Sequence, residues 1–239
     1  MTTEPTTAAG STDAGRAFAR RLAAESIAAG DPTGWLEAVY AAAARGTTTV
    51  PWADFAPNPY LVSALDGRTG GGRAVVTGCG LGDDAEHVAS LGYATTAFDI
   101  SPTAVTTARH RFPDSVVDYV AADLLAPPPS WAGAFGLVVE VYTLQVLTGT
   151  ARRTAIAQTA RLVAPGGRLL IIARARDEHD DPGTMPWPLT RAEIETFHGY
   201  GLRSESIVDF VDENGPTPVR RWRAWFTTPP HRQNDPEPR

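Results

Sequence analysis

The sequence predicts an α/β fold in which a doubly wound, mostly parallel sheet has helices on both faces. From residue 73 onward, short runs rich in β-branched residues alternate with stretches of helical periodicity. These runs are continuously apolar, which indicates strands that are covered on both faces. A glycine-rich loop follows the first run and opens a helical stretch, and in such folds ligands bind at the strand ends.

The pattern predicts five parallel strands followed by a hairpin. Strands are expected at residues 73–78, 93–99, 116–122, 135–141 and 168–174, with helices at 83–91, 102–112 and 150–163. Two further strands, 203–211 and 219–227, are joined by the turn-rich residues 212–218. The predicted sheet therefore has seven strands, and the last one is antiparallel.

Local signals define several helix ends. Residues 83–86 and 190–193 have the spacing of capping boxes, and Ser101 with Pro102 is a favoured N-cap and first-turn pair. The Ala-Pro-Gly-Gly run at 164–167 is expected to stop a helix before the fifth strand.

The N-terminal region is expected to form a cap over this core. Residues 14–29 and 33–44 are alanine-rich with helical apolar spacing, and the Pro-rich residues 50–61 follow them. We therefore expect N-terminal cap helices and a loop at 14–61.

The core at 73–227 and this cap are predicted to make one domain at 14–228. Residues 1–13 and 229–239 are polar or Pro-rich with little to bury, so disorder is expected there.

Composition and net charge limit the classes of partner and the compartment that are expected for this chain. The chain of 239 residues has a formal net charge of −6, so a nucleic-acid partner is not expected. No apolar run is long enough to span a bilayer, and the N-terminus lacks the apolar region of a signal peptide. The single cysteine, Cys79, excludes internal disulfides, so a cytoplasmic protein is expected. The oligomeric state stays open, and a monomer is compatible with the sequence.

Polar residues at three consecutive strand ends predict a ligand site. Gly78, Gly80 and Gly82 follow the first strand, Asp99 ends the second, and Asp123 follows the third. Gly80, Gly82 and Ala85 also fit a pattern that binds NAD. However, the paired acids Asp83 and Asp84 would repel a pyrophosphate at this helix start, whereas they suit a cationic ligand.

The motifs G-C-G-L-G-D-D, F-D-I-S and A-A-D-L resemble those of the class I S-adenosylmethionine-dependent methyltransferases, and the resemblance covers about residues 73–227. It implies a Rossmann-like sheet and S-adenosyl-L-methionine as cofactor. With the strand-end positions and the expected cap, the cofactor-binding residues are predicted to be Gly78, Cys79, Gly80, Gly82, Asp83, Asp99, Ile100, Ser101, Asp123, Leu124, Glu140 and Trp52.

A narrower resemblance is to the thiopurine and thiol/halide S-methyltransferases. It rests on Gly34 with Trp35, on the stretch V-P-W-A-D-F-A-P-N-P, and on a loop that reads P-G-C-G-x-G-x-D in that branch. Thr77 stands here where proline is usual. The resemblance implies that N-terminal tryptophans cover the cofactor and the acceptor, so Trp35 is expected on the acceptor. Trp187 lies between two prolines in the long loop at 177–190, a context that suits a lid, and it is also expected on the acceptor.

Several residues are candidates for the methyl-transfer site. Glu140 is out of place inside an apolar strand, and Tyr142 follows it, so both are candidate catalytic residues and Tyr142 also a substrate contact. Arg174 leaves the fifth strand and could hold an anionic acceptor. Cys79 is expected to pack in the core rather than act as a nucleophile. The histidines show no ligand spacing, so no metal site is expected.

The sequence thus predicts transfer of a methyl group to a small-molecule acceptor. No convincing general base is found, which favours a thiol or another soft nucleophile. One alternative is an O- or N-methyltransferase with His179, His198 or Glu140 as base. The others are a cofactor-binding module without catalysis and an NAD-dependent enzyme.

Overall fold

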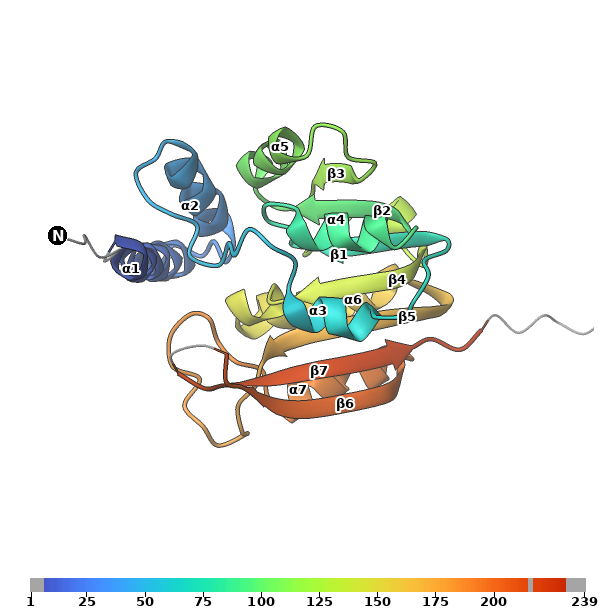
Figure 1. Cartoon of the computed structure of the whole chain (residues 1–239). Coiled ribbons are helices and arrows are strands. Elements are labelled where there is room, and N and C mark those ends of the chain that lie inside the picture. The colour runs from blue at the N-terminus through green and yellow to red at the C-terminus, as the bar shows by residue number, and fades with distance from the viewer. Residues whose placement is uncertain (1–6, 215–216, 231–239) are drawn as a thin grey trace, which may run out of the picture.

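The computed structural model describes residues 7–214 and 217–230, within which a single seven-stranded sheet lies between two layers of helices (Figure 1). The strand order is β3-β2-β1-β4-β5-β7-β6. The strands are β1 Arg73–Thr77, β2 Ala94–Asp99, β3 Asp118–Ala121, β4 Phe135–Val141, β5 Val163–Arg174, β6 Arg203–Asp212 and β7 Val219–Thr227. All pairs up to β5 are parallel, and β7 runs antiparallel between β5 and β6. This confirms the predicted fold class.

The helices follow the predicted alternation. They are α1 Thr7–Ala28, α2 Gly34–Ala44, α3 Pro59–Leu65, α4 Asp83–Ser90, α5 Pro102–Arg111, α6 Gly149–Leu162 and α7 Arg191–Glu195. Short 3₁₀ turns are η1 Pro129–Trp131, η2 Leu144–Val146 and η3 Thr196–Tyr200. Helix α3 was not expected within the Pro-rich segment. Asn58 starts it by accepting hydrogen bonds from the N–H groups of Tyr60 and Leu61.

The chain ends differ from the prediction where they are described. Helix α1 begins at Thr7, so residues 7–13 are helical rather than disordered. Residues 1–6 and 231–239, for which disorder was also predicted, lie outside the described residues. At the other end, the carbonyl of Pro229 accepts a hydrogen bond from Gly166 N–H, which places the start of the predicted tail against β5.

Two of the three predicted caps are confirmed. Thr190 and Glu193 form a reciprocal capping box at α7, and Ser101 accepts from the N–H of Ala104 at α5. The capping box at residues 83–86 is wrong, because α4 begins at Asp83 itself after Gly82, which has a φ of 96°. The N-cap residue is therefore Gly82, which has no side chain to cap the helix but adopts the left-handed backbone conformation without steric cost.

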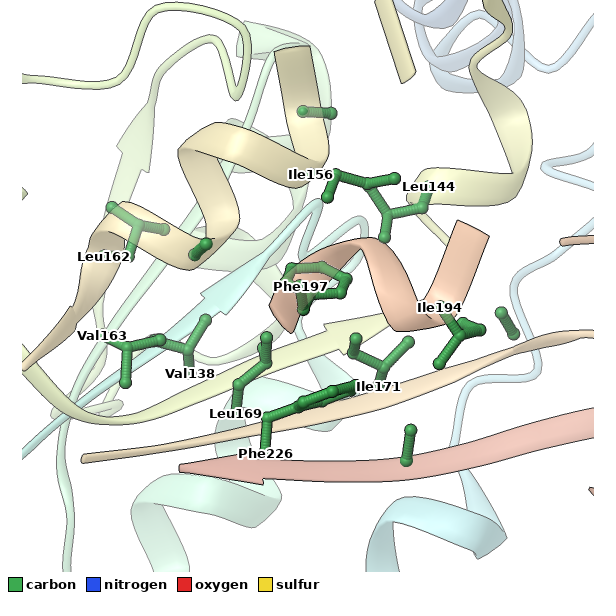
Figure 2. Packing of buried hydrophobic residues seen from close by; sticks show 14 of the residues in the cluster. Val138, Leu144, Ile156, Leu162, Val163, Leu169, Ile171, Ile194, Phe197 and Phe226 are labelled. Atoms are coloured by element: carbon green, nitrogen blue, oxygen red, sulfur yellow. The ribbon is translucent and has the colours of Figure 1, made fainter. Parts of the chain in front are cut away.

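Each face of the sheet carries its own apolar cluster. On one face, α6, α7 and η3 cover the strands, and Figure 2 shows Ile156, Ile194 and Phe197 turned toward Leu169 and Ile171. On the other face, α3, α4 and α5 supply the cover. Successive strand residues therefore enter opposite clusters, which explains why the strands are continuously apolar in sequence.

The first two helices stand apart from this sandwich. Figure 1 shows α1 and α2 beyond the edge of the sheet where the parallel strands end. They pack through a small cluster in which Ala19, Ala23, Trp35 and Val39 meet Met185 from the loop after β5. The helices thus form the predicted cap over the strand ends. Within the described residues, no helix has the length and apolarity that a membrane span requires.

Candidate functional site

A cavity of about 810 Å³ lies between the carboxyl ends of the strands and the cap. Its walls come from the loop after β1, from the ends of β2, β4 and β5, from β7, and from α1 and α2. Parallel sheets open at this edge, because the connections from neighbouring strands leave in opposite directions there. The sequence-predicted site and the cavity therefore coincide in position.

The glycine loop forms the floor of the cavity. Gly78 and Gly80 line it with φ values of 58° and 53°, a left-handed backbone that glycine adopts without steric cost. A Cβ atom at Gly78 would overlap Thr143 Oγ1, and one at Gly80 would lie 3.0 Å from Tyr40 Oη. Cys79 also lines the cavity, and burial raises the pKa of its thiol well above its usual value, so the thiol is neutral.

Asp99 ends β2 and lines the same cavity. Its Oδ2 accepts from Gly80 N–H at 2.9 Å, and its Oδ1 accepts from Ser101 N–H at 2.9 Å. Each oxygen keeps a second acceptor position, so the carboxylate can receive two hydroxyl groups. Burial raises the pKa of Asp99 to about 6.

The end of β3 completes this half of the cavity. Asp123 accepts from Leu125 N–H at 2.7 Å, which fixes the loop that carries it. Ile100, Asp123 and Leu124 all line the cavity, as the sequence predicted. These positions combine two apolar side chains with a carboxylate that can accept hydrogen bonds, which suits a nucleoside.

The two neighbouring acids of α4 have different electrostatic roles. Asp83 lines the cavity, but its carboxylate is paired with Arg111 at 2.6 and 2.8 Å. Asp84 instead accepts from the backbone N–H of Asn58 at 2.6 Å, and burial raises its pKa to about 6. The sequence argument about repulsion of phosphate therefore depends on Asp84, because Arg111 offsets the charge of Asp83.

An aromatic group joins the cap to the cavity. Trp52 is 37% exposed, lines the cavity and donates from Nε1 to Tyr40 Oη at 2.9 Å. Its ring meets those of Trp35 and Tyr40 edge to face at 6.0 and 5.8 Å. Trp52 therefore lies at the cavity, and its hydrogen bond to Tyr40 holds it there.

Tyr142 stands where β4 leaves the sheet and lines the cavity. Its φ of 62° is rare for a residue with a large side chain, and such strain is concentrated at functional sites. The guanidinium of Arg221 lies 5.1 Å from the centre of its ring. Burial raises the pKa of its phenol, so the group is neutral.

Glu140 does not face the cavity, which corrects the prediction of a catalytic or cofactor-binding role. Its side chain is fully buried, and Oε1 accepts from Thr143 N–H at 2.7 Å and from Leu144 N–H at 2.8 Å. Burial raises its pKa to about 7. The carboxyl group thus stabilises the turn that follows β4, and this explains a glutamate inside an apolar strand.

Four further predicted residues lie outside the cavity wall. Gly82 is buried against Tyr119, and Ser101 donates to Glu37 while it caps α5. Trp35 is 1% exposed in the core of the cap, and Trp187 packs against that cluster. These residues position the wall without forming it.

Several cavity residues were not identified from the sequence. Among them are Arg16, Arg20, Tyr40, Asn58, Gln145 and Arg221, while Asp84 was considered only for its charge. Asp84 had a signal, since it occupies the last position of the P-G-C-G-x-G-x-D pattern. The arginines had none, because residues of α1 and β7 meet only in the folded chain.

Charge is divided across the cavity. Five carboxylates line the half over β1, β2 and β3: Asp54, Asp83, Asp84, Asp99 and Asp123. Four arginines line the half over β5 and β7: Arg16, Arg20, Arg174 and Arg221. S-adenosylmethionine fits the acidic half, because its sulfonium and ammonium groups would offset the buried charges of Asp84 and Asp99. Within the described residues, no group of metal-ligating side chains gathers here or elsewhere.

This electrostatic fit predicts a pH dependence of cofactor binding. Asp84 and Asp99 have pKa values of about 6, and a bound cation favours their charged forms, so binding releases protons in acid. We expect the affinity for S-adenosylmethionine to rise from about pH 5 to about pH 7 and then to level. Calorimetric titration across this range measures it. An Asp84→Asn variant should show a shallower rise, and an affinity independent of pH would contradict the assignment.

Comparisons with known proteins find similarity to methyltransferases. The sequence profile of a family described as a methyltransferase domain matches residues 75–171. A probable thiol methyltransferase of Arabidopsis thaliana is 28% identical over 187 residues, which cover 74% of this chain and 81% of that protein.

Solved structures share the fold. One, from work on the conversion of a disulfide bond into a thioacetal group during echinomycin biosynthesis, has a TM-score of 0.65 at 26% identity and covers 81% of this chain and 93% of that one. An N-methyltransferase from Bradyrhizobium japonicum in complex with S-adenosyl-L-homocysteine has a TM-score of 0.60 at 24% identity, with 75% and 92% covered.

Proposed function

We propose that this chain, which is a class I S-adenosylmethionine-dependent methyltransferase, transfers the methyl group to the sulfur of a small thiol. The cofactor is S-adenosylmethionine. A volume of about 810 Å³ suits the cofactor together with a small acceptor rather than a macromolecule.

The observation that carries the proposal is the composition of the acceptor half of the cavity. Within the described residues, no histidine lines the cavity. The carboxylate in the basic half, Asp212, is ion-paired with Arg221 at 2.6 Å. An alcohol or an ammonium group needs a base to lose its proton, whereas a thiol with a pKa near 8.5 ionises readily, and nearby guanidinium groups favour the thiolate.

The residues suggested as bases for O- or N-methylation lie elsewhere. His179 is in the exposed loop after β5, and His198 packs against Phe226 with ring centres 5.6 Å apart. Glu140 is buried on backbone N–H groups. The likeness to a probable thiol methyltransferase supports the same choice of acceptor.

The residues of the chain align the acceptor with the methyl group and exclude water from the cavity. The bound cofactor supplies an electrophilic methyl group. Tyr142 and Thr143 at the end of β4 border its expected position, and Trp52 and Tyr40 close the cavity from the cap. Positioning of this kind can lower a barrier by about 7–11 kcal/mol.

A matched set of acceptors tests the proposal. Thiophenol, phenol and aniline differ in the acceptor atom on one ring, so we expect label from methyl-labelled cofactor to pass to thiophenol at least about tenfold faster than to the others. The Asp99→Asn variant serves as the background control. A higher rate with phenol or aniline would contradict the proposal, as would the absence of transfer to any thiol in a wider panel.

A further inference from the structure

Four arginines from three distant segments meet at one end of the cavity. Arg16 and Arg20 come from α1, Arg174 ends β5, and Arg221 lies on β7. Arg174 and Arg221 are directly opposite each other in the antiparallel pairing of β5 with β7. Like charges so placed repel, and a protein retains such an arrangement only where other interactions offset the cost.

Three of these arginines have partners within the protein. Arg221 donates from Nε and Nη2 to Asp212 Oδ2 at 2.8 and 2.6 Å. Arg20 donates from Nε to the carbonyl of Met185 at 2.9 Å, and Arg16 is paired with Asp13 at 3.4 Å.

Arg174 is the exception. Its backbone N–H donates to Gln145 Oε1 at 2.8 Å, but its guanidinium has no carboxylate or carbonyl partner among the residues that the structure describes. The side chain is partly buried and lines the cavity. Burial and the neighbouring arginines lower its pKa, because both disfavour the charged form of the guanidinium group.

The geometry of a guanidinium group determines which ligand group pairs with it best. Its planar array of donors matches the two oxygens of a carboxylate, and such charge-assisted pairs are about twice as strong as neutral hydrogen bonds. The carboxylates that line the acidic half of the cavity repel the carboxylate of an acceptor. A carboxylate that enters the cavity is therefore directed toward β5 and β7.

We propose that Arg174 binds a carboxylate of the methyl acceptor, which is then a small mercapto-carboxylic acid. This inference rests on the proposed thiol methylation. The acceptor thiolate forms the new S–CH₃ bond while the sulfonium–CH₃ bond breaks, and that electron pair remains on the cofactor sulfur. The thiol proton has gone to solvent beforehand, and the carboxylate is unchanged in the reaction.

A charge-matched pair of thiols tests the inference. We expect the wild-type protein to methylate 3-mercaptopropionate with a kcat/KM about tenfold to a hundredfold higher than 3-mercaptopropionamide, which has the same shape without the charge. In Arg174→Met this ratio should fall to about one, chiefly through KM for the acid. Arg174→Lys should keep part of the preference, because the charge remains but the planar fork is lost.

Two further measurements separate recognition from folding. Arg223→Met is the matched control, since Arg223 lies on β7 two residues from Arg221 and does not line the cavity. It should keep the full preference. Calorimetry should show that Arg174→Met binds S-adenosylmethionine as the wild type does, and that it no longer binds 3-(methylthio)propionate in the presence of S-adenosylhomocysteine.

The possible failures are distinguishable. Equal rates for the acid and the amide in the wild type, or an unchanged preference in Arg174→Met, would overturn this inference and leave thiol methylation standing. No transfer to either thiol, nor to thiophenol, would overturn the proposed function and this inference with it.

Discussion

Asp99→Asn should weaken the binding of S-adenosylmethionine by at least about a hundredfold. We expect the carboxylate to accept hydrogen bonds from both ribose hydroxyls, and bonds to a charged acceptor contribute about 1.5–3 kcal/mol each. The amide has the same size but offers one acceptor oxygen instead of two. Calorimetric titration with S-adenosylmethionine and S-adenosylhomocysteine measures the loss.

The same substitution should also lower stability. The sequence predicts Asp99 only as a ligand contact, but in the structure its oxygens also accept hydrogen bonds from Gly80 N–H and Ser101 N–H at 2.9 Å. The amide leaves one of these buried donors without an acceptor, at a cost of about 1–3 kcal/mol in the free energy of unfolding. Asp118→Asn, an exposed position on β3 outside the cavity, should change neither quantity. An unchanged dissociation constant for Asp99→Asn would show that the ribose lies elsewhere.

Arg152→Met should cause the largest loss of stability. The Arg152 side chain is 7% exposed and donates to the carbonyl of Leu147 at 2.8 Å, to Glu193 Oε1 at 2.6 Å and to the carbonyl of Trp187 at 2.8 Å. It therefore joins α6 to the turn after β4, to α7 and to the loop before α7. Removal of one partner from a buried ion pair costs about 3–5 kcal/mol, which corresponds to a fall of roughly 10 °C in Tm for a chain of this length.

The neighbouring residue provides the control. Arg153 is exposed and, among the residues that the structure describes, its side chain donates only to Thr150 within α6. Arg153→Met should therefore change the free energy of unfolding by less than about 0.5 kcal/mol. Thermal and urea unfolding of both variants measure the difference. Equal melting temperatures would mean that the contacts of Arg152 do not hold these segments together.

The site could be predicted from sequence where chain order alone controls position. Glycines that follow one strand and aspartates that end the next two must meet, because parallel neighbours end at the same edge of a sheet. Gly78, Gly80, Asp99 and Asp123 accordingly line one cavity. Tyr142 and Arg174 were found for the same reason, since each lies at the end of a strand.

Burial and ion pairing could not be predicted in this way. Glu140 has the composition signal of a functional residue, yet it accepts hydrogen bonds from Thr143 and Leu144 beneath the turn. Asp83 and Asp84 are adjacent in sequence, but only Asp83 is reached by Arg111 from α5. These differences depend on contacts across the fold, which a local pattern does not contain.

The sequence by itself determined the alternation of strands and helices in the core, the two-sided burial of the sheet and the edge of the sheet at which the cavity lies. It did so because periodicity and strand direction are local properties that accumulate along the chain. The tertiary structure alone decided that four arginines from α1, β5 and β7 gather opposite the carboxylates of the glycine loop. It also decided that the Arg174 guanidinium is left without a partner among the described residues. The physical reason is that electrostatic pairing depends on distance in space. Residues 16 and 221 line the same cavity only because the folded chain packs the cap over the strand ends.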